Sequence, residues 1–129
     1  MSYLEKEIDE ACDTLKINSR KLDSNELNVL VNSLTRKFFK SQSNVLDPTE
    51  LNEKCTEHNP KFWKEMSYRI SKNGLVLLVF DSKYRAWEID TAPVLASVLG
   101  ETTGYPFWIT DNELTFLVHM DDHDCVIWA

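Results

Sequence analysis

Hydrophobic side chains in the first half of the chain recur every three to four residues, which is the spacing of one buried helix face. Two such stretches, residues 4–15 and residues 27–38, predict amphipathic helices. Asp23 followed by Glu26 has the form of a capping box and marks the start of the second helix. The basic residues near the end of that helix suit the negative end of a helix dipole.

Two more helices are predicted before residue 74. Asp47 is the expected N-cap of a short helix with Pro48 at its first position, and we expect this helix to end near Cys55. Apolar residues at helical spacing in residues 62–70 predict another helix, which Gly74 is expected to close.

After Gly74 the pattern changes to one that predicts strands. Residues 75–80 are six consecutive apolar residues, which is typical of a strand covered on both faces. Residues 85–90 alternate between apolar and polar side chains and predict an antiparallel partner. A short helix over residues 91–99 and a third strand over residues 105–109 are expected to follow.

The last sixteen residues predict a β-hairpin. Residues 114–120 alternate, which indicates a strand with one buried face. The residues expected on that face are Leu114, Phe116, Val118 and Met120. Residues 121–124 form the expected turn, and residues 125–128 form the returning strand.

This order predicts a single α+β domain over residues 1–129. Its helical part spans residues 1–73 and its sheet part spans residues 74–129. The sheet part has the order β-β-α-β-β-β, so we expect N-terminal helices packed on a mainly antiparallel sheet of about five strands with one short helix inserted.

Charge is distributed unevenly along the chain, whose net charge is −7. Residues 81–129 hold nine acidic and two basic residues, whereas residues 1–80 hold twelve of each. Because phosphate-binding surfaces need clustered Lys and Arg, the distribution argues against nucleic acid or an anionic membrane as a partner. It favours a cationic partner, or no partner.

The cysteines and the hydropathy of the sequence favour a cytoplasmic location. Cys12, Cys55 and Cys125 are odd in number and far apart, unlike a disulfide framework. The N-terminal residues lack the apolar segment of a signal peptide, and no apolar run approaches the ~20 residues of a membrane-spanning helix. We therefore expect reduced thiols in a cytoplasmic protein.

Candidate chemistry is sparse. His119 and His123 flank carboxylates and are candidate metal ligands, with a solvated hairpin turn as the alternative explanation. Cys125 has no base placed beside it, and the three glycines have capping or turn roles rather than a phosphate-binding one. We expect no catalytic residue, no bound metal and no cofactor.

Several aromatic residues of the strands do not fit the buried face of a single sheet. Trp87 and Trp108 are two of them, and aromatic side chains beside carboxylates suit a protein interface. The alternative is that helices cover both faces of part of the sheet.

The C-terminal half resembles small bacterial immunity proteins, such as those of contact-dependent growth inhibition and other polymorphic toxin systems. The resemblance covers roughly the last fifty-five residues. It is carried by the Leu-rich strand, the aromatic strand over residues 105–109, the turn at Thr110 and Asp111, the strand over residues 114–118, and the acidic turn with His123 and Asp124. It implies a cytosolic antidote that binds a cognate toxin domain, often a basic nuclease, and blocks its substrate cleft.

The resemblance and the charge distribution lead to the same prediction, an immunity protein that neutralises a cationic toxin through an acidic face. The residues predicted to contact the partner are Asp111, Glu113, Asp121, Asp122, Asp124, Trp87 and Trp108. Two alternatives stay open. One is a binding or regulatory module for another cationic protein or ligand, and the other is a metal-dependent enzyme that uses His119 and His123.

Overall fold

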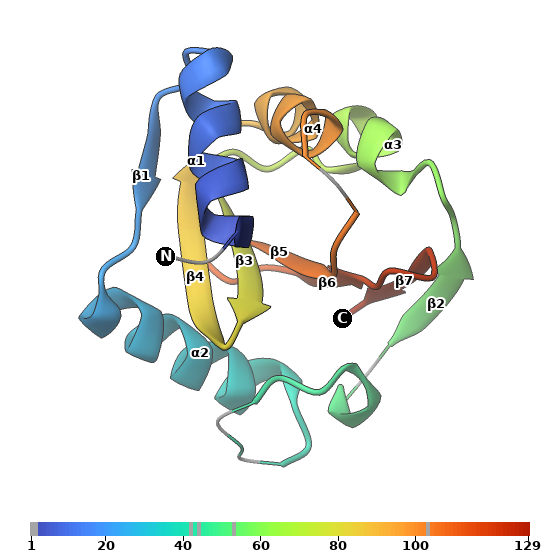
Figure 1. Cartoon of the computed structure of the whole chain (residues 1–129). Coiled ribbons are helices and arrows are strands. Elements are labelled where there is room, and N and C mark those ends of the chain that lie inside the picture. The colour runs from blue at the N-terminus through green and yellow to red at the C-terminus, as the bar shows by residue number, and fades with distance from the viewer. Residues whose placement is uncertain (1–2, 42, 44, 53, 103) are drawn as a thin grey trace.

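The computed structural model describes residues 3–41, 43, 45–52, 54–102 and 104–129. Helices cover both faces of one antiparallel sheet (Figure 1). The helices are α1 (Tyr3–Thr14), α2 (Ser24–Phe38), α3 (Phe62–Arg69) and α4 (Ala92–Gly100), with a short 3-10 turn η1 (Pro48–Glu50). The strands are β1 (Ser19–Lys21), β2 (Cys55–His58), β3 (Leu75–Asp81), β4 (Lys83–Ile89), β5 (Phe107–Asp111), β6 (Leu117–Met120) and β7 (Cys125–Trp128).

The sheet has seven strands in the order β1-β4-β3-β5-β6-β7-β2, and every neighbouring pair is antiparallel. The predicted α+β class is confirmed, but the prediction of about five strands is wrong. The two additional strands, β1 and β2, come from the N-terminal half and form the two edges of the sheet. They are short and polar, so they lack the hydrophobic alternation that marks a half-buried strand.

The capping signals of the sequence are present where they were expected. The Asp23 side chain accepts a hydrogen bond from the Glu26 backbone, and the Glu26 side chain accepts one in return. Asp47 caps η1 and accepts a hydrogen bond from the Thr49 N–H. However, the helix predicted to run from there to Cys55 is a single 3-10 turn. The chain is extended at Leu51, which forms a bridge with Phe39, and it then enters β2.

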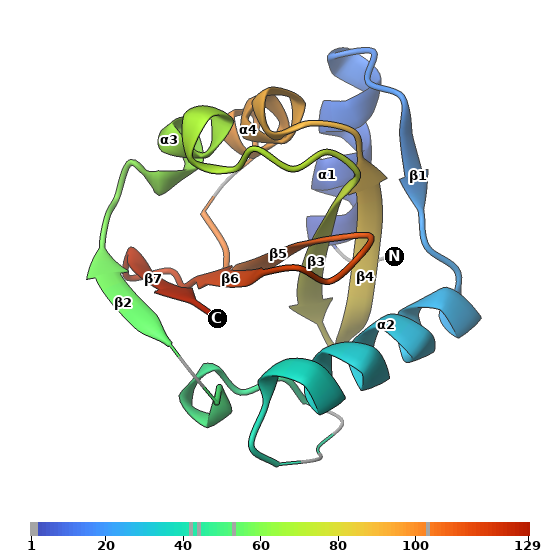
Figure 2. The same cartoon turned by 180° about the vertical axis from the view of Figure 1, so that it is seen from behind.

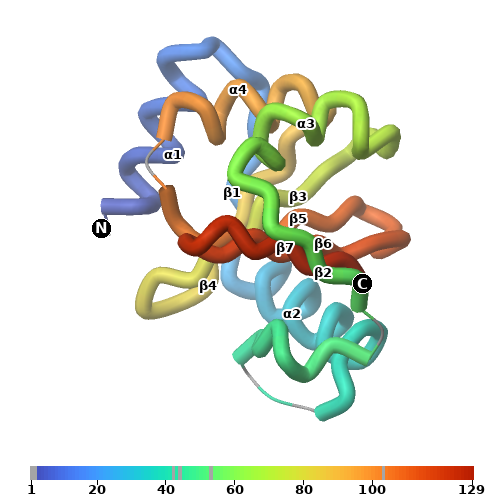
Figure 3. The backbone as a smooth tube through the Cα atoms, turned by 90° about the vertical axis from the view of Figure 1, so that its right-hand side faces the viewer, coloured from blue at the N-terminus to red at the C-terminus, as the bar shows by residue number. Residues whose placement is uncertain are grey.

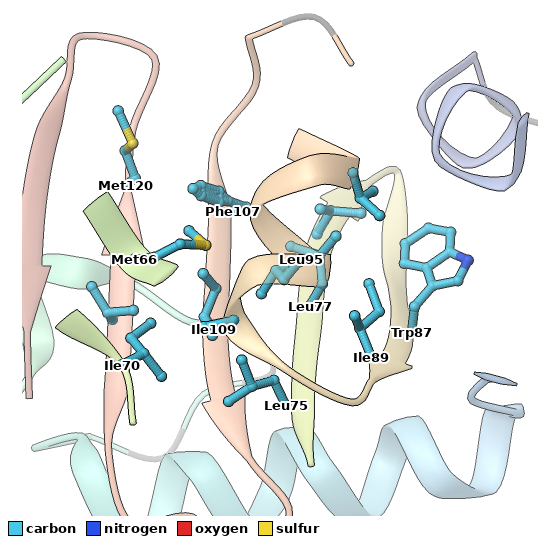
Figure 4. Close-up of a cluster of buried hydrophobic side chains, with 14 of the residues drawn as sticks. Met66, Ile70, Leu75, Leu77, Trp87, Ile89, Leu95, Phe107, Ile109 and Met120 are labelled. Atoms are coloured by element: carbon cyan, nitrogen blue, oxygen red, sulfur yellow. The ribbon is translucent and has the colours of Figure 1, made fainter. Parts of the chain in front are cut away.

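The sheet is the middle layer of three. Figure 2 shows α1, α3 and α4 on one side of the sheet and α2 on the other, and Figure 3 shows the same layers from the β2 edge. Side chains from α1, α3 and α4 pack with alternate residues of the central strands in the larger core (Figure 4). The intervening residues of the same strands pack with α2 and the segment around η1 in a second core.

Burial on both faces explains why the C-terminal strands differ from the predicted alternation. β6 begins at Leu117, and all four of its residues are buried. Val118 and Met120 pack in the core of α1, α3 and α4, whereas Leu117 packs in the core of α2. Leu114 lies before the strand in a turn, with a φ of 55°. The expectation that Leu117 and His119 face solvent is therefore wrong, because α2 and η1 form a second layer.

None of the described helices is long and apolar enough to cross a membrane.

Candidate functional site

The turn between β6 and β7 carries three carboxylates, and we call Asp121, Asp122 and Asp124 the acidic tip. The Asp121 side chain accepts hydrogen bonds from the backbone N–H groups of His123 at 2.8 Å and Cys125 at 2.9 Å. Asp124 has a φ of 65°, which aspartate tolerates better than most residues. Asp121 therefore shapes the turn, and the Asp122 side chain, 62% exposed, faces solvent.

The hydrogen bonds to Asp121 stabilise its charged form. Burial raises the pKa of this carboxyl group, but the N–H groups of Cys125 and His123 outweigh that effect and hold the pKa below its ordinary value. Asp121 is therefore ionised at neutral pH, like a solvated aspartate.

Among the described residues, no lysine or arginine forms a salt bridge with the acidic tip, whose ion-pair contact is the one between Asp122 and His123. Several acidic residues elsewhere are paired with Lys or Arg. Arg20 bridges Glu26 and Glu88, and Lys21 contacts Asp9 at 2.6 Å. These ion pairs join β1 to neighbouring elements and neutralise charge across the sheet edge. As a result, the negative charge at the turn is not compensated by Lys or Arg.

A cavity of about 250 Å³ opens beside the acidic tip, and we call it the tip cavity. It lies among the start of α3, the end of α4, the start of β5 and the β6–β7 turn. Its lining residues are Pro60, Trp63, Leu99, Gly100, Thr102, Gly104, Tyr105, Phe107, Met120, Asp121, Asp122 and Asp124. The described lining therefore combines aromatic side chains and three carboxylates, and it includes no Lys or Arg.

Close packing fixes the aromatic wall of the tip cavity. A Cβ atom on Gly100 would lie 2.9 Å from the Trp63 ring, so the absence of a side chain at the end of α4 lets this ring approach the helix. The Tyr105 hydroxyl is 2.9 Å from the Thr102 hydroxyl. Phe107 and Met120, which are opposite each other on β5 and β6, are buried.

Tyr105 contributes a neutral ring to this wall. Burial raises the pKa of Tyr105 to about 12, and the carboxylate of Glu7 on α1 adds to the increase, although the hydrogen bond with Thr102 opposes it. Tyr105 is therefore protonated at neutral pH. The negative charge of the tip cavity comes from its carboxylates alone.

Two of the predicted contact carboxylates do not belong to this site. Asp111 is 3% exposed and accepts hydrogen bonds from the backbone N–H and the hydroxyl of Thr115, so it closes the turn between β5 and β6. Glu113 is exposed in that same turn, at the opposite end of β6 from the acidic tip. The prediction that all five carboxylates form one face is wrong, because β6 separates its two turns.

The two predicted tryptophan anchors are not on the surface. Trp87 is 1% exposed, and its indole N–H donates to Asp9 at 2.9 Å. Trp108 is 4% exposed and packs against Phe39 and His119. The prediction that these rings contact a partner is wrong, since helices cover both faces of the sheet, which was the alternative open at the sequence level.

The two histidines considered as metal ligands lie in different environments, since one is buried and the other is exposed. His119 is 8% exposed, and its ring lies 4.3 Å from the Trp108 ring in the core on the α2 side. His123 is exposed in the turn, where it lies 3.7 Å from Asp122. Within the described part of the chain, no group of three or more His, Cys, Asp or Glu side chains is arranged to hold a metal ion.

Sequence reasoning missed the aromatic residues of the tip cavity. Trp63 fitted the core face of a predicted helix, and Tyr105 fitted the start of a predicted strand. The only local signal was the position of these aromatic residues close to Pro60 and Gly104, which mark the ends of elements. Nothing in their spacing connects them with a turn that begins sixteen residues after Tyr105.

Comparisons of the chain with protein-family models, with curated proteins and with solved structures gave no match.

Proposed function

We propose that this protein is an immunity-type antidote that binds a cationic toxin domain through the acidic tip and the tip cavity. The observation that carries the proposal is the group of three carboxylates, without a Lys or Arg partner among the described residues, in the lining of a cavity with aromatic walls. A basic domain that binds nucleic acid presents clustered Lys and Arg at its substrate cleft. The acidic tip is complementary to such a surface.

In this proposal the charged turn acts during the approach of the two proteins. Complementary charge accelerates the encounter and orients the partners, and salt weakens both effects. The hydrogen bonds of Asp121 hold the turn in place before binding, so that little conformational entropy is lost when the partner arrives. The carboxylates then occupy positions where the toxin would hold phosphate groups.

The chain acts by binding alone in this proposal, without catalysis, metal or cofactor. It works in the cytoplasm, where the toxin would reach its nucleic acid substrate. Carboxylates and partly buried aromatic groups at one end of the sheet supply the contact, and the two buried cores supply a rigid scaffold. Rigid scaffolds position interface groups without a large ordering cost.

A growth assay tests the function. Cells produce, as the toxin to be tested, a basic domain encoded by a reading frame beside the gene for this chain, together with the wild-type chain or a variant. In the tip variant, Asp122→Lys and Asp124→Asn change two carboxylates that the fold does not use as hydrogen-bond caps, and Asn tolerates the positive φ at position 124. We expect the wild-type chain to restore growth and the tip variant to lose at least about tenfold in protection, because like charges at an interface repel.

A matched control carries the same change in net charge at the other end of β6. Asp90→Lys and Glu113→Gln alter two exposed carboxylates near the turn between β5 and β6. We expect this far-end variant to protect as well as the wild type. Equal protection by the tip variant would overturn the proposed interface, and a wild-type chain that restores no growth would favour a module for another cationic partner.

A further inference from the structure

The tip cavity has the dimensions of a site for one side chain. Its volume of about 250 Å³ is below the roughly 300–1,000 Å³ of pockets that hold drug-sized ligands. Phe107 and Met120 in its lining are buried, and Trp63 and Tyr105 are partly buried. An occupant therefore meets apolar and aromatic groups together with carboxylates.

This combination suits an organic cation that has a flat, weakly hydrated charged group. Aromatic rings attract a cation through the negative face of the ring, and the guanidinium of arginine also stacks on them. The Trp63 ring makes a cation–π contact of this kind outside the cavity lining, since the Lys64 ammonium lies 5.2 Å from its centroid. The carboxylates of the lining add charge-assisted hydrogen bonds, which arginine forms more strongly than neutral donors do.

We propose that the tip cavity binds an arginine side chain of the protein partner and is the anchor point of the interface. This inference rests on the proposed function for the identity of the partner. The charge complementarity and the size of the cavity carry the choice of occupant. Arginine is one of the residues enriched at interface hot spots, which lie in well-packed pockets surrounded by contacts that exclude water.

A titration of the whole folded chain with a short peptide tests the cavity directly. The probe is the capped pentapeptide Gly-Gly-Arg-Gly-Gly, and its matched control has citrulline, a neutral isostere, in place of arginine. We expect saturable NMR shifts of the Trp63 indole N–H and the Gly104 amide with the arginine peptide. The citrulline peptide should bind at least about tenfold more weakly, because it lacks the charge.

Two variants show whether the carboxylates and the space are both needed. Asp122→Asn with Asp124→Asn removes charge and keeps a residue that tolerates the positive φ at position 124. Gly104→Leu adds bulk at the cavity, where a Cβ atom meets no atom within 4 Å. We expect each to weaken the arginine peptide at least about tenfold. Ser97→Leu, on an exposed part of α4 outside the cavity, should not change its affinity.

The outcomes separate this inference from the proposed function. If the two peptides bind equally, or if neither binds, the cavity is not an arginine site, even where the growth assay shows an antidote. Spermidine that binds more tightly than the arginine peptide would also overturn the inference, in favour of a small organic cation. Arginine-specific binding together with loss of protection in Gly104→Leu supports it. Failure of the wild-type chain to protect would refute the function separately.

Discussion

Aspartates in the last third of the chain differ in role according to whether their carboxylates accept hydrogen bonds from backbone N–H groups. Asp111 is buried and bonded to Thr115, and Asp121 is bonded to His123 and Cys125. Asp122 is exposed, and its carboxylate lies 3.7 Å from the His123 ring. The first two stabilise turns, whereas Asp122 is available for a partner. Residue type alone does not distinguish these roles.

His119 shows how a polar residue in the core makes stability depend on pH. Its Nδ1 atom is buried with no hydrogen-bond partner in the structure. Burial lowers the pKa of His119 from 6.5 to about 4, although the charge of Asp121 acts in the opposite direction. The folded state therefore binds fewer protons than the unfolded state between these two values.

We expect the free energy of unfolding to be unaffected by His119 above pH 6.5 and to fall as the pH drops toward 4. The shift of the pKa from 6.5 to about 4 corresponds to about 3 kcal/mol in total. Urea unfolding between pH 7 and pH 4 measures this loss. Glu26 affects the free energy of unfolding at lower pH than His119 does, because its pKa falls from 4.5 to about 2 beside Arg20.

His119→Phe is the control for this pH dependence. It keeps a ring beside Trp108 and removes the titrating group, so we expect its stability to be nearly constant between pH 6.5 and 4.5. A parallel decline of the wild type and this variant across that range would show that another group is responsible.

At the scale of elements, the β6–β7 hairpin depends on the side chain of Asp121. Replacement by alanine removes the acceptor for two backbone N–H groups, so we expect a loss of about 1–3 kcal/mol in the free energy of unfolding. Asp121→Asn keeps one oxygen acceptor and should lose less. Urea unfolding measures the loss, and hydrogen exchange at the amides of His123 and Cys125 locates it.

Equal stability of the two Asp121 variants would contradict this explanation, since it would show that charge and not hydrogen bonding holds the turn. Unchanged exchange at both amides in Asp121→Ala would contradict it as well.

The elements that the sequence could predict are those set by local side-chain patterns. Helices α1 and α2 followed from apolar spacing, and the Asp23 and Asp47 caps followed from local side-chain chemistry. Strands β1 and β2 did not, because an edge strand is held by backbone hydrogen bonds to a neighbour that is distant in sequence. The predicted helix up to Cys55 was wrong for the same reason.

In the whole molecule, the distribution of charge in space differs from its distribution along the chain. Arg20, from the balanced half, lies beside Glu88, from the acidic half, and so reduces the predicted excess. Asp111 and Glu113 lie at the other end of β6 from Asp122. The sequence therefore indicated an acidic turn but not the cavity beside it, which forms only when α3, α4 and the hairpin come together.

The affinity of the purified toxin domain for the wild-type chain, the tip variant and the far-end variant tests the central claim most directly. We expect the wild type and the far-end variant to bind alike at physiological salt, and the tip variant to bind at least about tenfold more weakly. Higher salt should narrow this difference, because it screens exposed charge. Equal affinity of all three proteins would contradict the claim that the acidic tip contacts a cationic partner.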